Sequence, residues 1–397
     1  TFKRDDKNEW SIIEPLEAKA DSYEVNRLAE DFSNLKFERV VEAEGGDPAK
    51  YEIPKKELTI WSKGQAQPVR LLVGMENPLD NTLFAKREDE KRIVLLASYL
   101  KSNLEKKTFD FRQKDIFRFE SDDVGSIKLK AKDIFWEARK RETDWFLEAP
   151  VKALAKKSRV EDVLRALSNI RAKDFVSEKK QEAEIARFGL AEPDYSVTLG
   201  LPAKNQEIVF SLHKQDETVY ATTSASPKIV SAEAQVLTDI EKKAEDLREK
   251  AVLVFNSWEA SKVRLKKGDL TLAVAKDKDG KWLFEGAEKE EADRSRVETF
   301  IRKVESLEAA EFVDQPAEPS AYGLDKPQAE VTVWTKDGDT EKEFQVLVGK
   351  EDPEKKQVVV KNPRLEYLFR VDSAFLSDLP KETKDWKPAP PEEKKET

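Results

Sequence analysis

The sequence is poor in the residue types that perform most protein chemistry. Its 397 residues include no cysteine, one histidine and one methionine. Without cysteine the chain forms no disulfide and no thiolate nucleophile, and a single histidine cannot supply a Cys/His zinc site, a Cys-His dyad or a two-histidine mechanism. Composition therefore excludes most of the usual catalytic and metal-binding arrangements.

Glycine and long apolar runs are scarce as well. The 13 glycines form no phosphate loop with a following Lys-Ser/Thr, no G-x-G-x-x-G and no G-x-S-x-G elbow. The longer apolar windows, 93–97 and 251–255, fall far short of the roughly 18 to 20 residues that a membrane span needs. We expect the printed chain to be soluble.

Charge is abundant and nearly balanced. Lys and Arg number 71 and Asp and Glu 80, a net charge of −9, and 38% of residues are charged beside 39% hydrophobic ones. This composition indicates a heavily solvated globular protein, and its acidic balance predicts no nucleic-acid partner. A length of 397 residues suggests two or three domains, because one hydrophobic core stops growing well before this size.

An internal repeat organises the chain. Segments led by Trp10, Trp145 and Trp282 align without gaps and start 135 and 137 residues apart. At offsets of 10, 15, 25 and 31 residues from the tryptophan they share Ala20, Ala155 and Ala292; Val25, Val160 and Val297; Leu35, Ile170 and Leu307; and Val41, Val176 and Val313. A nearly constant period of this length predicts tandem copies of one structural unit.

After each tryptophan, apolar residues at three- and four-residue spacing predict a helix whose apolar face covers a sheet. The stripes are Val25, Leu28, Phe32 and Leu35; Val160, Val163, Leu167 and Ile170; and Val297, Phe300, Val304 and Leu307. A serine stands close before each stripe, where its hydroxyl can accept from the first-turn N–H groups. Ser22, Ser158 and Ser295 are therefore the predicted N-caps.

Strands are predicted on both sides of this helix. Upstream they are expected at 126–129, 133–137, 262–265 and 270–274, with a turn at 277–280. Downstream they are expected at 58–61, 71–74 and 82–85, at 195–199 and 208–210, and at 331–334, 346–349 and 358–360. A short helix near 98–100, 234–237 and 373–376 closes each copy.

The predicted fold class is α+β: tandem repeats of a β-rich module with two helices per repeat, in about three copies. Repeat 1 is expected at residues 1–120 and is truncated at its N-terminus, lacking its first strands, so we expect something upstream of Thr1 to have been left out. Repeat 2 is expected at 121–257 and repeat 3 at 258–386. Residues 387–397, rich in proline and charge, are predicted to be a disordered tail or linker.

Two sets of residues invite a functional interpretation. Trp10, Trp145 and Trp282 could form a row that stacks on sugars or peptides, although a repeated tryptophan before alternating apolar residues is more typical of a core. His213, which follows a strand, could act as a lone acid or base, but no partner nucleophile or second ligand accompanies it. We favour a structural role for all four.

Clusters of charge have a similar explanation. The pairs Asp122-Asp123 and Asp277 with Asp279 lack the spacing of a calcium loop, and turn formation explains them. The acidic run at 88–90 is flanked by basic residues and is a predicted solvated loop, whereas 179–184 and 241–249 carry the charge spacing of exposed helices. We assign no catalytic, cofactor-binding or metal-ligating residue and expect no cofactor.

Several of these segments resemble a known family. The run from Trp145 to Val151, the following stretch Val160–Phe175 and the run Tyr322–Pro327 are similar to the bacterial domain of unknown function 4340, and Leu347-Val348-Gly349 fits the same pattern. The resemblance extends to about Trp386. Copy two departs from it, having Ser211-Leu212-His213 where its neighbours have the glycine.

The resemblance implies a place in the cell. Proteins of this family are typically bacterial envelope proteins with an N-terminal membrane anchor, often encoded beside ABC transporter subunits of the gliding-motility auxiliary type. It therefore implies an extracytoplasmic accessory protein, periplasmic or on the outer face, anchored by an N-terminal helix that this chain does not include. The membrane would be reached only through that anchor.

Three functional hypotheses follow. The first is a non-catalytic scaffold whose tandem modules dock on an ABC transporter, its auxiliary subunits or another envelope complex. The alternative is a module that binds a cell-wall or surface polymer, which predicts that Trp61, Trp258 or Trp334 is exposed beside a groove. A less favoured hydrolase would need two buried carboxylates about 5 to 10 Å apart in a cleft.

Overall fold

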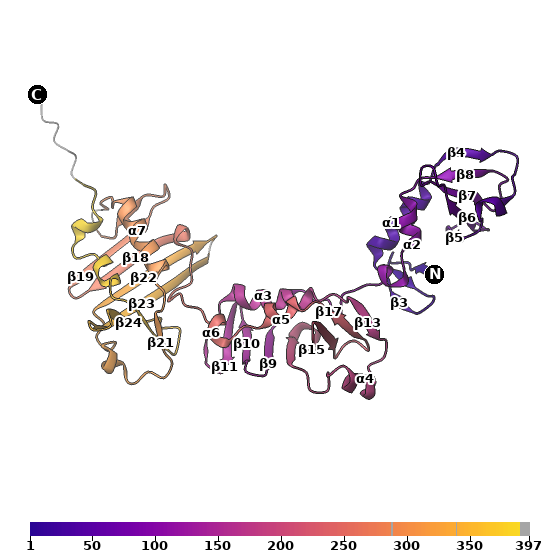
Figure 1. Ribbon diagram of the computed structural model, residues 1–397. Helices are drawn as coiled ribbons and strands as arrows, with labels where there is room; N and C mark the ends of the chain where they lie inside the picture. Colours follow the sequence, from indigo (N-terminus) through magenta and orange to yellow (C-terminus); the bar gives the residue numbers. More distant parts are fainter. Residues whose placement is uncertain (287–288, 339, 390–397) are drawn as a thin grey trace, which may run out of the picture. The chain divides into compact units, whose positions relative to one another are not determined.

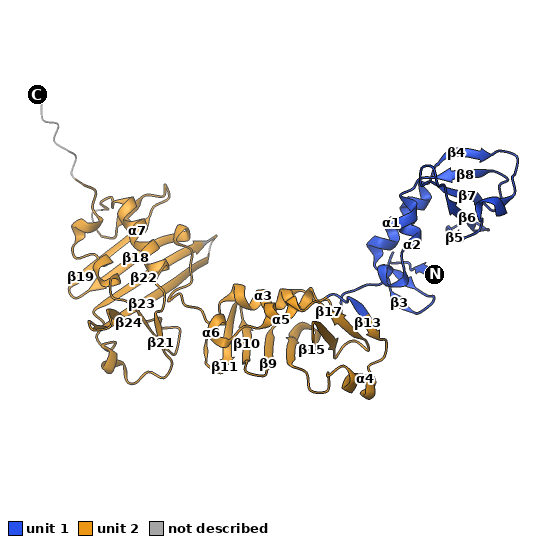
Figure 2. Ribbon diagram, viewed as in Figure 1, with its two compact units in different colours: residues 1–115, 171–174 blue, residues 116–170, 175–397 orange. Residues whose placement is uncertain are grey.

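The computed structural model describes residues 1–286, 289–338 and 340–389, and in this part of the chain it has mixed α and β structure with eight α-helices and four sheets (Figure 1). The chain divides into two compact units, residues 1–115 with 171–174 and residues 116–170 with 175–397 (Figure 2). The predicted α+β class is confirmed. Most of the predicted tail, 390–397, lies outside the described residues.

The first unit holds two antiparallel sheets. The smaller has the order β1-β2-β3 and the larger the order β4-β8-β7-β6-β5. Their strands are β1 (Phe2–Arg4), β2 (Trp10–Ile12), β3 (Ala18–Lys19), β4 (Phe37–Glu42), β5 (Lys56–Ile60), β6 (Val69–Glu76), β7 (Leu83–Arg87) and β8 (Ile93–Leu96).

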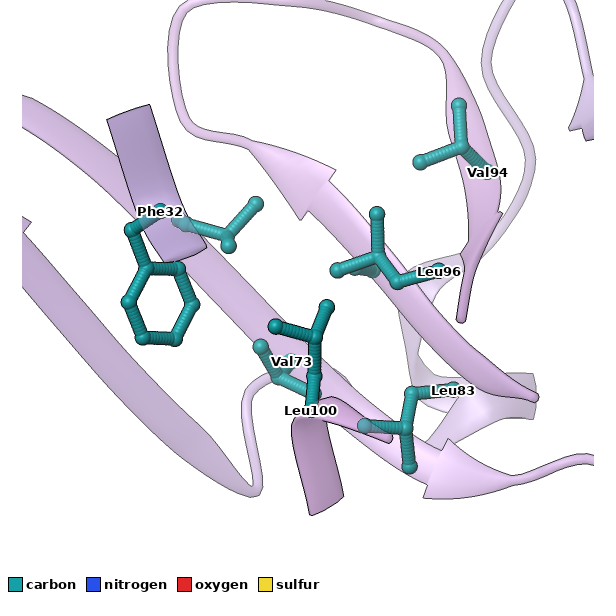
Figure 3. Close-up of a cluster of buried hydrophobic side chains, with 8 residues drawn as sticks. Phe32, Val73, Leu83, Val94, Leu96 and Leu100 are labelled. Carbon is teal, nitrogen blue, oxygen red and sulfur yellow. The ribbon is translucent and has the colours of Figure 1, made fainter. Parts of the chain in front are cut away.

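One helix, α1 (Ser22–Ser33), joins the cores of these two sheets. Leu28 of this helix packs against the apolar cluster of each sheet. The cluster of the larger sheet contains Phe32, Val73, Leu83, Val94, Leu96 and Leu100 (Figure 3). The two sheets therefore share one covering helix.

The second unit holds a nine-stranded and an eight-stranded sheet. The first has the order β12-β11-β10-β9-β14-β15-β16-β17-β13, and its strands are β9 (Ser126–Ala131), β10 (Phe135–Arg141), β11 (Asp144–Ala149), β12 (Ala153–Leu154), β13 (Asp174–Ser177), β14 (Tyr195–Leu201), β15 (Gln206–Gln215), β16 (Thr218–Thr223) and β17 (Ile229–Ala232). The second has the order β20-β19-β18-β22-β23-β24-β25-β21, and its strands are β18 (Ala260–Lys267), β19 (Leu270–Lys276), β20 (Trp282–Phe284), β21 (Glu311–Val313), β22 (Ala329–Asp337), β23 (Thr340–Asp352), β24 (Gln357–Lys361) and β25 (Leu368–Asp372).

Three helices of equal length follow the three tryptophans: α1, α3 (Lys157–Ser168) and α7 (Arg294–Glu305), each of 12 residues. Their inward faces bury Val25 and Phe32; Val160, Val163, Leu164 and Leu167; and Val297, Phe300, Ile301 and Val304. The predicted apolar stripes are confirmed within the helices. The last residue of each predicted stripe, Leu35, Ile170 or Leu307, lies just beyond the helix end.

The predicted serine caps are wrong, because the three serines lie inside the first helical turn. The carboxylate of Asp21 accepts from the backbone N–H groups of Tyr23 and Glu24, and that of Asp293 accepts from Arg296 N. Lys156 precedes α3 without a capping side-chain bond. An N-cap needs extended backbone dihedrals, which these earlier residues have.

The residue before each long helix also makes a long-range backbone hydrogen bond. Its backbone N–H donates to the carbonyl of a buried apolar residue more than eighty positions later. These pairs are Asp21 with Phe111, Lys156 with Leu247, and Asp293 with Trp386, at 2.8, 2.7 and 2.7 Å. The start of each long helix is therefore hydrogen-bonded to a segment that follows the last strand of the same predicted repeat.

The remaining helices are short: α2 (Leu100–Glu105), α4 (Glu182–Arg187), α5 (Gln235–Ile240), α6 (Ala244–Leu247) and α8 (Phe375–Asp378). The predicted short helices near 98–100, 234–237 and 373–376 correspond to α2, α5 and α8. The prediction of an exposed helix over 241–249 is wrong, since only α6 is helical and Leu247 and Arg248 are buried. Charge spacing alone does not show that the chain becomes buried at Leu247 and Arg248.

Two glycines occupy positions where a backbone carbonyl approaches closely. A Cβ at Gly349 would lie 2.3 Å from Tyr322 O, and one at Gly74 would lie 2.1 Å from Tyr51 O.

We expect Gly349→Ala to lower the free energy of unfolding by about 1–3 kcal/mol, because the strand must move away from that carbonyl. Ser211→Ala on β15, a half-buried position where the substitution only removes a hydroxyl, is the control and should change it by less than about 0.5 kcal/mol. Equal losses in denaturant titrations would contradict the close-approach explanation.

Candidate functional site

The repeated tryptophans are packing residues. Trp145 and Trp282 are each 1% exposed, so the predicted core role is confirmed for both. Trp10 is half-buried, and its Nε1 donates to Asn26 Oδ1 at 2.7 Å. A stacking row built from all three would need Trp145 and Trp282 at the surface, and the sheets enclose them.

His213 also has a local structural environment. Its Nδ1 lies 3.1 Å from Asp194 Oδ2, and the same carboxylate accepts from Lys214 N at 2.8 Å. The ring lies where a side chain at residue 189 would otherwise be, since a Cβ on Gly189 would be 2.2 Å from His213 Cδ2. The histidine ring therefore fills the space beside Gly189, and the aligned glycine of copy three, Gly323, faces Lys350 instead.

The acidic pairs are engaged in ion pairs and turns. Asp122 lies 3.4 Å from Lys140 Nζ and Asp123 lies 2.9 Å from Lys204 Nζ. Asp277 Oδ1 accepts from two backbone N–H groups of its own turn at 2.9 Å. Within residues 1–286, 289–338 and 340–389, no group of three or more His, Asp or Glu side chains is placed to hold a metal ion.

Two open depressions lie on the second unit. One, of about 280 Å³, is lined by Glu120, Ser121, Asp122, Glu161 and Arg165. The other, of about 400 Å³, is lined by residues 179–181 and 224–227. In the described part of the chain no Asp or Glu belongs to the buried polar residues, and Asp122 is 98% exposed. That the protein is not an enzyme stays a prediction.

The three candidate tryptophans for ligand contact differ in environment. Trp61 is 70% and Trp258 73% exposed. Trp334 packs between two cations, with Lys262 Nζ 4.9 Å and Arg264 Cζ 5.0 Å from its ring centroid. Exposure is therefore confirmed for two of the three, and both depressions described above are lined by other residues.

The most organised polar contact lies where the chain passes from the nine-stranded to the eight-stranded sheet. Arg248 is 7% exposed, and its guanidinium carbon lies 3.5 Å from the Phe312 ring centroid and 4.6 Å from that of Tyr367. Its Nη2 donates to Asp314 Oδ1 at 2.5 Å. Tyr367 is 2% exposed, burial raises its pKa, and its hydroxyl accepts from Leu154 N at 3.3 Å.

Backbone hydrogen bonds run along the same passage. Glu249 N donates to Leu154 O at 2.9 Å, next to β12 of the nine-stranded sheet. On the other side, Val252 N donates to Leu307 O at 2.9 Å, and Ala309 N donates to Lys250 O at 2.8 Å. We use the name seam for residues 248–252 together with their partners, which are Leu154, Leu307, Ala309, Phe312, Asp314 and Tyr367. Sequence reasoning missed the seam, although the apolar run 251–255 was a signal that the charged stretch ends in a buried segment.

A half-buried tyrosine is paired with a glutamate that precedes α6. Tyr195, at the start of β14, donates from its hydroxyl to Glu241 Oε1. Burial first, and then Glu241, raise the pKa of Tyr195 from 10.0 to about 12. The folded chain therefore keeps this proton where the unfolded chain loses it, and its contribution to stability falls as pH rises from about 10 to about 12.

Glu241→Gln is expected to lower the pKa of Tyr195 without returning it to the usual value, because burial remains. Ultraviolet difference absorbance between parent and Tyr195→Phe proteins isolates this phenol among the seven tyrosines. A pKa that stays unchanged in Glu241→Gln would contradict the role of the carboxylate.

Among the described residues, no helix combines the length and apolarity needed to cross a membrane.

These observations define an α+β protein. Its described part has antiparallel strands and three 12-residue helices, each of which buries apolar side chains. Residues 10–183 and 145–327 both match the family model described as Domain of unknown function (DUF4340). The chain belongs to this family, as its sequence resemblance predicted. The two matches begin at Trp10 and Trp145.

Other comparisons add little. No curated protein matches the chain. Among solved structures, it is similar to the DNA polymerase sliding clamp from Pseudomonas aeruginosa with ligand, at 8% identity over 78% of this chain and 77% of that one, with a TM-score of 0.15. The DNA polymerase III subunit beta from Pseudomonas aeruginosa matches at 8% identity, 78% of each chain and a TM-score of 0.15. At these TM-scores the likeness carries no argument about fold or function.

Proposed function

We propose that the chain is a tandem array of about three DUF4340 modules that acts as a non-catalytic accessory or scaffold protein of the bacterial envelope. It docks on an ABC transporter, its auxiliary subunits or another envelope complex, on the extracytoplasmic side. The proposed modules are residues 1–120, 121–257 and 258–386. The envelope location and the N-terminal anchor rest on the family resemblance.

The seam is the observation that carries the scaffold proposal. Residues 249–252 hydrogen-bond to the end of β12 on one side and to the chain after α7 on the other. Arg248 is buried in the same place against two aromatic rings. Tandem modules joined through their backbones offer an extended surface to a partner, which is the usual role of repeat arrays.

Crosslinking in native envelope membranes tests this function. A photoreactive residue replaces Trp258, which is 73% exposed, and the matched control carries it at Trp282, which is 1% exposed. We expect ABC transporter or auxiliary subunits to be crosslinked from the exposed position only. Recovery of no such subunit, under conditions that keep membrane complexes intact, would remove the proposal.

The exposed tryptophans favour a second candidate, a module for a cell-wall or surface polymer. Trp61 and Trp258 present large aromatic faces to solvent, and such faces stack on sugar rings. Polymer-binding isotherms should then weaken in Trp61→Ala and Trp258→Ala but not in Phe135→Ala, whose side chain is 43% exposed. Flat isotherms with the intact protein would eliminate this candidate.

A further inference from the structure

The two sheets of the first unit end in edges that have no neighbour among the described residues. β1 pairs with β2 alone, and β5 pairs with β6 alone. In the second unit one strand fills the corresponding place in each sheet: β9 lies between β10 and β14, and β18 lies between β19 and β22. The first unit therefore lacks one strand in an otherwise equivalent order.

The register supports this equivalence. Arg4 of β1 opposes Trp10, and its guanidinium carbon lies 5.5 Å from the Trp10 ring centroid. Lys276 of β19 opposes Trp282 in the same way, with its Nζ at 5.0 Å from the ring centroid. β1 therefore takes the place of the last residues of β19, whose other edge pairs with β18.

The side chains of β5 are less buried than those at the aligned positions of β22. The run Glu57-Leu58-Thr59-Ile60-Trp61 aligns with Glu330-Val331-Thr332-Val333-Trp334. Val331 and Val333 are fully buried opposite Leu265 and Val263 of β18, whereas Leu58 and Ile60 are half-buried. Trp61 is 70% exposed, whereas Trp334 is covered by two cations of β18.

The pairing of β18 defines the chemistry that this edge accepts. Lys266, Arg264 and Lys262 of β18 oppose Glu330, Thr332 and Trp334. The aligned residues Glu57, Thr59 and Trp61 present the same carboxylate, hydroxyl and indole. A matching strand places apolar side chains toward Leu58 and Ile60 and basic ones between them.

We infer that β1 and β5 together form an acceptor site for one strand with alternating basic and apolar residues, antiparallel to both, contributed by the same polypeptide through a hairpin to β1. The hairpin is argued from the second unit, where β9 joins β10 and β18 joins β19 in this way. The inference rests on the proposed equivalence of the modules and not on envelope docking, so the crosslinking experiment and the experiment below can fail independently.

A graft tests the site in the full chain. Residues 260–272, which hold β18, its turn and the start of β19, are placed directly before Thr1. We expect amide hydrogen exchange in Lys56–Ile60 to slow by about tenfold or more, because edge amides gain partners and local opening becomes rarer. The control graft carries Val263→Asp and Leu265→Asp, which removes the apolar face of the strand.

The exchange of β14 and β22 amides serves as the reference for folding in both grafts. Slowing of the β5 amides in the parent graft but not in the control supports the inference. Equal β5 exchange in the two grafts, with unchanged β14 and β22, overturns it. Concentration-dependent β5 protection in the ungrafted chain, with a dimer in sedimentation, would also overturn it, because a second copy would then be the occupant.

Discussion

Replacing Trp282 with alanine is expected to destabilise the eight-stranded sheet by about 3–5 kcal/mol. Trp282 is 1% exposed, so alanine leaves a large cavity and removes the contact with Lys276. Trp145→Ala should cost a similar amount in the nine-stranded sheet, where Trp145 is also 1% exposed. Because a chain of several cores need not unfold in one step, we would measure the loss as hydrogen exchange of core amides in the affected sheet.

Trp10→Ala is the matched control from the same repeat position. Trp10 is half-buried, and its indole keeps one hydrogen bond to Asn26. We expect a smaller loss of about 1–2 kcal/mol, from partial burial and that bond. If Trp10→Ala destabilised its sheet as much as Trp282→Ala, burial would not be what sets the cost at this position.

Arg248→Ala is expected to open the seam with a loss of about 3 kcal/mol. The substitution removes a buried cation held over Phe312 and Tyr367 and its hydrogen bond to Asp314. The direct measurement is faster exchange of the Glu249 and Val252 amides, whose hydrogen bonds cross the seam. Amides in the middle of β15 and β23 should keep their parent rates.

Arg187→Ala provides the comparison on the surface. Arg187 also lies over an aromatic ring, 5.1 Å from the Phe188 centroid, but its side chain is 69% exposed and its ion pair with Glu184 is open to water. We expect a change below about 0.5 kcal/mol. A loss in Arg248→Ala no larger than this would mean that the seam does not depend on the arginine.

Much of the secondary structure was predictable because its signals are local. The stripe of Val160, Val163 and Leu167 predicted α3, and alternating residues predicted β14 and β22. The helix starts were wrong by one or two residues, since a serine and a nearby aspartate or lysine are both plausible near a cap. Only the backbone dihedrals distinguish which of them precedes the first turn.

The candidate site was less predictable. The charged stretch 241–249 has the spacing of an exposed helix, yet it ends in Leu247 and Arg248, which are buried. Arg248 is stabilised by Phe312, Asp314 and Tyr367, which lie 64 to 119 residues later in the chain. No pattern within a few residues of Arg248 encodes those partners.

The sequence by itself determined the α+β class, the period of the tryptophan-led segments and the shortage of catalytic residue types. Each of these depends on composition or on residues close together along the chain. The tertiary structure decided which similar residues are covered. Trp61 and Trp334 stand in aligned runs, but within the described residues Trp334 packs against cations of the neighbouring β18, whereas Trp61 is 70% exposed. Burial depends on strands far apart in sequence, and for that reason the seam and the open edge of β5 appear only in the folded chain.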